Sequence, residues 1–310
     1  MAAPDSSVTH VFVVMLENHS FDNIFAMSGL PGIKVGKTSD CNSYNKQKYC
    51  VQAGALPRMP TDPGHEFADV VEQLAGEGKK YPRGGPYPPI DNSGFAANYA
   101  TSTTEGPAPH QQDIGDVMAC FKTRTQLKVI YQMAKLGAVR DQWYTSLPGP
   151  TWPNRFFLHG ASSSGLDDSP TDWEMAEWEI GTGFEYPNGS LYDRLRAAGI
   201  PYRFYIDSSG PPHWQSLYSD DPQDGTALGA VAQVCSLNGE SHLEVQYLSS
   251  LASDLQGPYP YKYTFIEPHY GDVGGTYMGG SSQHPRGRRP WRGAAPRKRL
   301  RRDPRVAVLE

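Results

Sequence analysis

The sequence predicts an α/β fold with three layers, in which helices cover both faces of a mostly parallel central sheet. Two observations carry this prediction. Short apolar runs typical of buried strands alternate with segments whose apolar residues recur every three or four positions, as on one face of a helix. Strand and helix also follow one another in the order of βαβ units, whose strands pair in parallel. No linker is clean enough to split residues 1–285, which we expect to form one domain.

The first half of the chain begins with a strand that ends in polar residues. The apolar run from Val11 to Leu16 stops at Glu17-Asn18, and Gly137 is a stop signal for a later helix. The expected elements are, in order, a strand at 11–16, helices at 62–76 and 125–138, and a strand at 138–146.

The second half repeats the alternation. Ser190 is the expected cap of a short helix, Gly199 the residue just past its end, and Glu267 the end of the last strand. The expected elements are a helix at 190–200, a strand at 202–207, an amphipathic segment at 243–255 and a strand at 261–268. Long polar loops, which are often functional, are expected at 28–62, 78–112 and 162–188.

Composition indicates a soluble globular protein. Of the 310 residues 38% are hydrophobic, and the mean hydropathy is -0.55. No apolar run approaches the roughly 18 residues that a membrane-spanning helix needs. The first ten residues lack the basic and apolar regions of a secretory signal. We therefore expect either a cytosolic chain or a mature or truncated form of an exported one.

Charge is distributed unevenly along the chain. Residues 286–310 contain ten Lys or Arg and two acids, whereas residues 1–285 contain 18 basic and 31 acidic residues. Such a basic tail on an acidic body is one pattern of a nucleic-acid-binding or membrane-binding arm.

Four cysteines are too few for a disulfide scaffold. Cys41 and Cys50 bracket a polar loop and either close a short ring or remain two free loop thiols. Cys120 and Cys235 lie in sequence typical of a core.

Four stretches place acids, amides, hydroxyls or histidines at the ends of elements: Glu17-Asn18, DPGHEF, PGPTWPNRF and SSQHP. Each has a structural interpretation. Asn18 or Ser20 would cap a helix, DPGHEF would be a turn, and Thr151 would cap a helix that begins near Pro153. SSQHP would be an ordinary loop.

The same stretches also have a chemical interpretation. Ligands bind beyond the carboxyl ends of strands in open α/β sheets, where Glu17 and Asn18 are expected. A hydroxyl at a helix N-terminus, such as that of Thr151, faces a site suited to phosphate and becomes a nucleophile when a divalent cation lowers its pKa. Histidines such as His65 and His284 are suited to contact phosphoryl oxygens or to protonate a leaving group.

Six stretches of the chain resemble, in the same order, the phosphoesterase family, which contains non-specific phospholipases C and related acid phosphatases. They are VVMLENHSFDNIF, DPGHEF, LPGPTWPNRFFLHGASS, SLYDRLRAAGIPYRFY, FIEPHYGD and SSQHP. The resemblance spans residues 9 to about 285, and its first and third stretches are long enough to be highly specific. It implies that the three-layer fold is alkaline-phosphatase-like.

The resemblance also implies roles for individual residues and a divalent metal ion as cofactor. Thr151 looks like the nucleophile, which is phosphorylated during the reaction. The implied metal ligands are Glu17, Asn18 and Thr151. The implied substrate-binding residues are Asn154, His65 and His284, of which the two histidines are also candidates for acid–base catalysis. Glu267 has the more modest role of orienting its neighbours.

Family members continue beyond SSQHP with an amphipathic helix and a strand ending in two acids, which complete the metal shell. No such strand follows here, so we expect the fold to be incomplete at its C-terminus. With synonymous codons chosen freely, a reading frame shifted by one nucleotide across residues 286–310 can encode a family-like helix, and we interpret this tail as non-native, frameshift-like sequence or as a disordered basic segment.

The resulting prediction is a metal-dependent hydrolase of phosphate esters, of the phospholipase C or acid phosphatase type, that acts through a phosphothreonine. The substrate is a phospholipid or a soluble phosphate monoester, and no nucleic-acid partner is expected. One alternative is a catalytically inactive remnant of the family. The other is a binder of nucleic acid or membrane surfaces through the basic tail. Family members are commonly secreted or periplasmic, but localisation and oligomeric state stay open.

Overall fold

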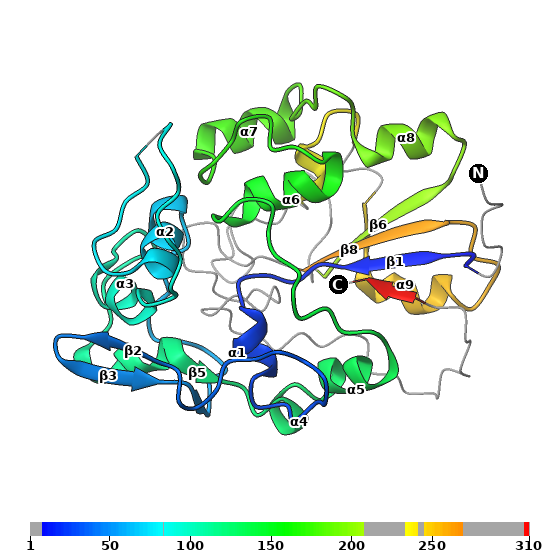
Figure 1. The fold of residues 1–310 in the computed structure, drawn as a ribbon. Helices are drawn as coiled ribbons and strands as arrows, with labels where there is room; N and C mark the ends of the chain where they lie inside the picture. The colour runs from blue at the N-terminus through cyan, green and yellow to red at the C-terminus, as the bar shows by residue number, and fades with distance from the viewer. Residues whose placement is uncertain (1–7, 83, 208–232, 241–244, 269–306, 310) are drawn as a thin grey trace, which may run out of the picture. The chain divides into compact units, whose positions relative to one another are not determined.

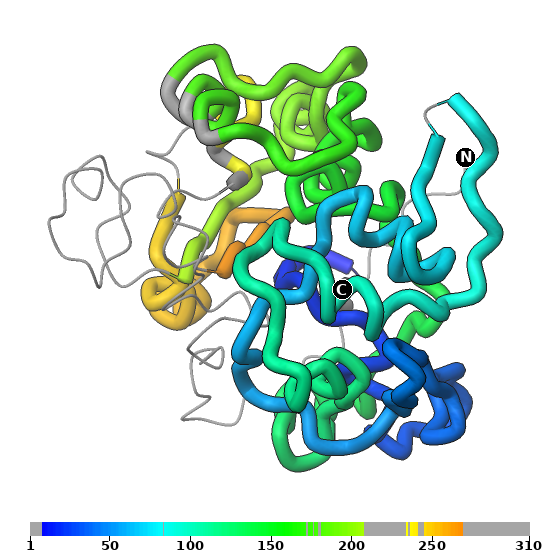
Figure 2. Tube along the Cα trace, turned by 90° about the vertical axis from the view of Figure 1, so that its left-hand side faces the viewer, coloured from blue at the N-terminus to red at the C-terminus, as the bar shows by residue number. Residues whose placement is uncertain are grey.

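The computed structural model describes residues 8–82, 84–207, 233–240, 245–268 and 307–309, which Figures 1 and 2 draw in colour. These residues belong to two compact units. Unit 1 comprises Met1–Glu17, His159–Ser164 and Pro170–Glu310, and unit 2 comprises Asn18–Leu158 and Gly165–Ser169. His284 and residues 286–306 of the basic tail lie outside the described residues.

Unit 1 contains a parallel sheet whose strand order is β7-β6-β8-β1-β9. Figure 1 labels its neighbouring strands β6, β8 and β1. Its strands are β1 (Val11–Val14), β6 (Tyr202–Ile206), β7 (Val245–Tyr247), β8 (Tyr263–Glu267) and β9 (Ala307–Leu309). Every neighbouring pair is parallel. The α/β class and the strands expected at 11–16, 202–207 and 261–268 are therefore confirmed. The amphipathic segment at 243–255 is split, because its first residues pair with β6 as a strand before a helix begins.

Helices lie on both faces of this sheet. The helical elements of unit 1 are α7 (Asp172–Ile180), α8 (Leu191–Ala197), α9 (Leu248–Asp254) and the 3-10 segment η3 (Gln233–Ser236). The Tyr192 ring of α8 meets the edge of Phe204 at a centroid distance of 4.8 Å. Tyr205, the next residue along β6, instead joins a buried cluster with Leu248 of α9. Since successive strand residues point to opposite faces, α8 and α9 cover different sides.

Helix α8 begins and ends as its sequence predicts. The Ser190 Oγ accepts the backbone N–H of Asp193 at 3.1 Å, and the Asp193 carboxylate accepts the backbone N–H of Ser190 at 2.7 Å. This reciprocal capping box satisfies two donors that the first turn would otherwise leave open. Gly199 follows the helix with a φ of 65°, a left-handed conformation that favours glycine.

Unit 2 contains short helices and small sheets. Its elements are α1 (Phe21–Phe25), β2 (Cys41–Tyr44), β3 (Gln47–Cys50), β4 (Gln52–Ala53), α2 (Phe67–Ala75), α3 (Phe95–Thr101), η1 (Gln111–Met118), β5 (Ala119–Cys120), α4 (Thr123–Gln126), α5 (Lys128–Leu136) and most of α6 (Thr151–Gly160). One buried cluster joins Tyr49, Ala96 and Ile114, and another joins Ala55, Ala119 and Phe121. Elements α2 and α5 confirm the helices expected in these regions.

Three expectations about local structure are wrong. No strand forms over 138–146, within which Trp143 and Tyr144 are exposed, because aromatic residues favour a strand only where another strand can pair with it. The polar regions at 28–62, 78–112 and 162–188 are not simple loops, since they contain the β2–β3 hairpin, α3 and α7. Helix α6 begins at Thr151 itself, so Pro153 lies within its first turn, where proline is tolerated.

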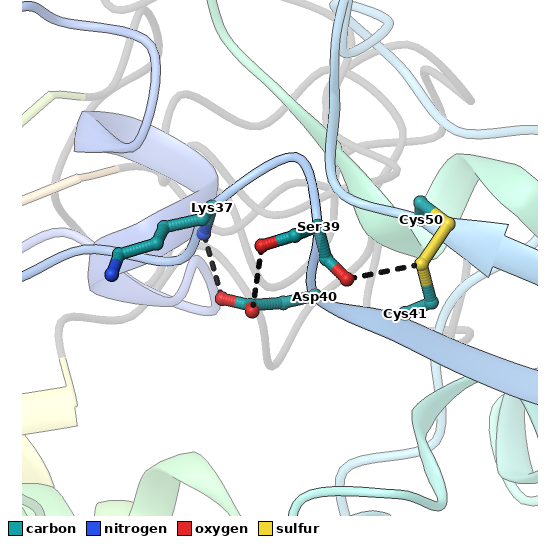
Figure 3. The surroundings of a disulfide bond; sticks show 5 residues. All are labelled: Lys37, Ser39, Asp40, Cys41 and Cys50. Atoms are coloured by element: carbon teal, nitrogen blue, oxygen red, sulfur yellow. Dashed lines mark hydrogen bonds between the residues drawn. A yellow bond between two sulfur atoms is a disulfide. The ribbon is translucent and has the colours of Figure 1, made fainter.

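The β2–β3 hairpin is closed by a disulfide. Cys41 and Cys50 are directly opposite one another in the antiparallel register, and their sulfurs are bonded (Figure 3). Asp40, just before the hairpin, accepts the backbone N–H of Lys37 at 2.8 Å (Figure 3). Of the two alternatives for this cysteine pair, the structure contains the ring. Cys120 is free and buried, as expected of a core residue.

Candidate active site

The polar residues after β1 lie where the strand gives way to a turn. The Met15 N–H still donates to the Ile266 carbonyl at 3.2 Å, so pairing with β8 reaches one residue past β1. Asn18 then has a φ of 61°, which is uncommon for a residue other than glycine. Ser20 caps α1 by accepting the Asn23 N–H at 3.1 Å. The capping role that the sequence left open between Asn18 and Ser20 thus belongs to Ser20.

The side chain of Asn18 contacts the histidine of the DPGHEF motif. Its Nδ2 lies 3.3 Å from Nδ1 of His65, and the Pro63 carbonyl oxygen lies 3.0 Å from the same ring nitrogen. The Pro63 carbonyl oxygen can only accept a hydrogen bond, so it pairs with a proton on Nδ1; the Asn18 Nδ2 is itself a donor and is then a neighbour of this nitrogen rather than its hydrogen-bond partner. Nε2 therefore either carries a second proton or presents a lone pair.

Two carboxylates face His65. The Glu105 Oε1 lies 3.4 Å from Nε2, and both side chains are largely buried, with 12% of His65 and 14% of Glu105 exposed. Burial alone lowers the pKa of His65, but Glu105, Asp62 and the Pro63 carbonyl outweigh it, so the pKa is raised. Burial raises the pKa of the Glu105 carboxyl, against the opposing effect of His65. Each partner therefore favours the charged form of the other.

The same three side chains form a donor set for a cation. Ligand atoms of Asp62, His65 and Glu105 all lie within 4.8 Å of one another. Two carboxylates and an imidazole suit a divalent metal ion, and an imidazole that donates its other N–H to a carbonyl is the usual support of a metal-bound histidine. At His65 Nε2, a proton and a metal ion are mutually exclusive.

A network around the buried Asp69 of α2 positions the two sides of this cluster. The Asp69 carboxylate of α2 accepts hydrogen bonds at 2.7 Å from the hydroxyls of Ser102 and Thr104, the latter adjacent to Glu105. Gln73 of the same helix donates to the Gly64 carbonyl just before His65. Helix α2 thus holds both chain segments that carry the His65–Glu105 pair.

Gly64 is required by this close approach. A Cβ atom at this position would lie 2.5 Å from Cγ of the buried Asp69 and 2.7 Å from Oγ of Ser102. No side chain fits there without moving the network, which explains the glycine in DPGHEF.

Thr151 and Asn154 form a second group, at the start of α6. The Asn154 Oδ1 accepts the Leu147 N–H at 3.0 Å, and its Nδ2 lies 2.9 Å from the Leu147 carbonyl oxygen and 3.0 Å from that of Pro150. The carboxamide therefore fastens the turn that leads into Thr151. In this structure Asn154 is a positioning residue for Thr151, whereas its predicted contact with substrate stays a prediction.

Two carboxylates of unit 1 belong to one edge of the sheet, as the sequence predicts. Strands β1 and β8 are parallel neighbours, so Glu17, just beyond β1, and Glu267, the last residue of β8, both lie at their carboxyl ends. Glu267 is fully buried, and its Oε2 lies 3.3 Å from the backbone N–H of Val234. Such a buried, hydrogen-bonded carboxylate fits the orienting role suggested for it.

Not every residue of interest was found from the sequence. Asp62 was interpreted only as a turn residue, and Glu105 and Asp69 were not singled out. Asp62 belongs to the DPGHEF motif, so its proximity to His65 was an available signal. Glu105 follows a run of Ser and Thr in a polar segment, where no periodicity marks it.

Comparison with known proteins places these motifs in a wider context. Residues 8–299 match the model of the Phosphoesterase family. The chain is 27% identical over 219 residues to non-specific phospholipase C3 of Arabidopsis thaliana, an alignment that covers 66% of this chain and 37% of the relative. It is 30% identical over 206 residues to non-specific phospholipase C1 of the same plant, covering 64% of this chain and 34% of the relative.

The alignments thus cover about two thirds of this chain and about a third of each relative. The family match extends past residue 285, where the resemblance was expected to end. Because this match covers nearly the whole sequence, including the segments that carry Asn18, His65 and Thr151, the chain is a member of the phosphoesterase family.

Proposed function

We propose that this chain carries the nucleophile and a phosphate-binding histidine of a phosphoesterase that hydrolyses phospholipids at the phosphate ester. The observation that supports this most directly is the contact between Asn18 and His65. It joins two family motifs that are 47 residues apart in sequence. The carboxylates beside His65 favour a protonated ring, and a cation at this position suits a phosphoryl group.

In the proposed reaction, the Thr151 Oγ gives up its proton to water, attacks phosphorus and forms a phosphothreonine as the bond to the ester oxygen breaks. His65 in its protonated form binds the phosphoryl oxygens or donates a proton to the leaving oxygen. Water then attacks the phosphothreonine, which releases inorganic phosphate or the phosphorylated headgroup and restores the hydroxyl of Thr151. Asn154 keeps the turn before Thr151 in place throughout.

A divalent metal ion fits the oxygen-rich chemistry of these motifs. Glu17, Asn18 and Thr151 are the residues that we propose would hold it, and all three offer oxygen donors of the kind that hard cations prefer. When bound, such an ion lowers the pKa of a coordinated hydroxyl and neutralises negative charge on the phosphate. The Asp62–His65–Glu105 cluster is a second donor set, which shares none of these three residues.

The phospholipid preference is taken from the names of the relatives, which are non-specific phospholipases C. The alternative substrate is a soluble phosphate monoester. Hydrolysis of phosphatidylcholine and of an aryl phosphate, measured side by side with and without a chelator, separates the two substrates and tests the metal requirement.

Thr151→Ala tests the nucleophile in the same assays, with Thr151→Ser as the matched control that keeps a hydroxyl. We expect no turnover above background for the alanine variant and measurable turnover for the serine variant. Undiminished activity of Thr151→Ala would remove Thr151 from this role. Absence of hydrolysis of both substrates by the parent chain would favour an inactive member of the family.

A further inference from the structure

One stretch of unit 2 combines exposed apolar side chains with basic ones. We call residues 122–146, which comprise α4, α5 and the segment after them, the basic aromatic stretch. From residue 124 to residue 146 no side chain is buried. The most exposed large apolar side chains are Val129 at 56%, Leu136 at 78%, Trp143 at 74% and Tyr144 at 79%. This concentration of exposed apolar residues is unusual for a surface that only faces water.

Helix α5 presents its polar and apolar groups to solvent together. At 100° per residue, its exposed residues fall on one side of the helix: Lys128, Val129, Gln132, Lys135 and Leu136. The opposite side, which includes Ile130 and Met133, is partly buried. Lysines beside exposed aliphatic side chains are typical of helices that lie in a membrane interface.

The charge of the stretch contrasts with that of the rest of the chain. It contains five Lys or Arg and one acid, whereas residues 1–285 as a whole contain 18 basic and 31 acidic residues. The single acid, Asp141, already accepts the backbone N–H of Lys34. The basic aromatic stretch is therefore a positive region on an otherwise acidic body, which complements an anionic surface.

We propose that the basic aromatic stretch docks the protein on an anionic phospholipid surface. Trp143 and Tyr144 would lie at the level of the headgroups, and the Lys and Arg side chains would contact anionic lipids. Tyr144 precedes Thr151 by seven residues, and the turn between them is the one that Asn154 fastens. Docking would thus bring the turn before Thr151 close to the lipid surface that contains the substrate. This advantage rests on the proposed phospholipid specificity.

The chain offers a matched control in α7. Trp173 is 78% exposed, nearly the same as Trp143, but α7 contains four acids and no basic residue. The carboxylates of that helix are repelled by anionic lipid and hold its aromatic side chain away from the surface. If exposure alone decided vesicle binding, replacing either tryptophan would weaken it equally. Charge-assisted docking predicts that only the replacement of Trp143 weakens vesicle binding.

Co-sedimentation with vesicles tests the proposal, using phosphatidylcholine with and without phosphatidylserine at low and high salt. We expect the full chain to bind the phosphatidylserine vesicles and to release them at high salt. Trp143→Ser/Tyr144→Ser should weaken binding at least tenfold, and Lys128→Glu/Lys135→Glu should weaken it at least fivefold for each charge removed. Trp173→Ser should bind like the parent chain, and thermal melts check that every variant is folded.

Equal binding by the Trp143→Ser/Tyr144→Ser variant, or an equal loss in Trp173→Ser, would overturn the proposal. So would a concentration-dependent dimer that this double variant abolishes, because the stretch would then contact a second copy of the chain. Vesicle binding without hydrolysis of any ester would reject only the proposed function. Hydrolysis of phosphatidylcholine without vesicle binding would reject only the docking.

Discussion

Two histidines, one in each unit, show how differently the chain uses the same residue. His65 in unit 2 lies between an amide, a backbone carbonyl and carboxylates. His159 in unit 1 is 1% exposed, its Nδ1 lies 2.9 Å from the Tyr192 hydroxyl, and its ring meets the edge of Phe265 at a centroid distance of 4.9 Å. The surroundings of His65 control the charge of its ring, whereas the ring of His159 fills space between α8 and the sheet. Surroundings, rather than residue type, separate a candidate catalytic group from a core residue.

The largest expected effect is on activity, at His65. His65→Ala should lower hydrolysis of phosphate esters by at least about a hundredfold, the typical contribution of a positioned acid or base. The melting temperature should fall less than in a core variant, because the ring is held mainly by polar contacts. Steady-state rates and thermal melts of the same preparation measure both quantities. A fall in melting temperature as large as that of a core variant would assign His65 to packing instead.

At His159 the main expected effect is on stability rather than on activity. His159→Ala should lower the free energy of unfolding by about 3 kcal/mol, because it leaves a cavity beside Phe265 and removes the hydrogen-bond partner of the Tyr192 hydroxyl. Denaturant titration followed by circular dichroism measures this loss. His159→Phe refills the space and should recover part of it. Normal stability of the alanine variant would contradict a packing role.

Glu105→Gln changes the charge beside His65 while keeping the shape. In the presence of a chelator, the pKa of His65 should fall, since the carboxylate that raises it is gone, and ring-proton NMR measures the shift. A histidine with a raised pKa stabilises the fold fully below its unfolded pKa of about 6.5, and this contribution is lost as pH rises through the folded pKa. The variant should therefore lose stability mainly at acidic to neutral pH.

The rate of ester hydrolysis should fall about tenfold in the same variant, as for other residues that act through a histidine. Glu66→Gln, which changes the carboxylate with the weakest effect on the His65 pKa, is the matched control and should shift that pKa less. An unchanged His65 pKa in Glu105→Gln would show that Glu105 does not control the charge of His65.

The smallest effect is expected far from the site, at the cap of α8. Ser190→Ala should lower the free energy of unfolding by about 1 kcal/mol without altering activity. Hydrogen bonds from Ser190 lower the pKa of the Asp193 carboxyl, so its contribution is present above the unfolded pKa and is lost as pH falls through the folded one. Unfolding measured at neutral and acidic pH should thus show a smaller difference between the variant and the parent in acid, where only the pH-independent hydrogen bond to the Asp193 N–H separates them.

Elements with a local sequence signal could be predicted, whichever unit contains them. Strands β1, β6 and β8 and the capped helix α8 could be predicted, because burial against a sheet imposes continuous apolar runs and helix ends require particular residues. The pairing of Glu105 with His65 could not. It depends on the hydrogen bonds from Thr104 and Ser102 to Asp69, which link residues over 30 positions apart and leave no periodic pattern.

The failed strand at 138–146 has a related cause. Its aromatic residues suit a sheet, but no described strand pairs with it, and these residues are exposed instead. Local sequence patterns thus predicted helices and strands that have a clear apolar face. They failed where the structure of a segment depends on contacts with segments distant in sequence.

The most direct test of the proposed chemistry is to look for phosphate on Thr151. The parent chain is mixed with excess phosphate ester, quenched in acid within the first turnovers, digested and mapped by mass spectrometry. A phosphoryl group on the peptide that contains Thr151, absent from Thr151→Ala and cleared once substrate is exhausted, is the predicted result. Ester hydrolysis with no phosphorylated Thr151 at any quench time, or with the phosphoryl group on another residue, would contradict the account.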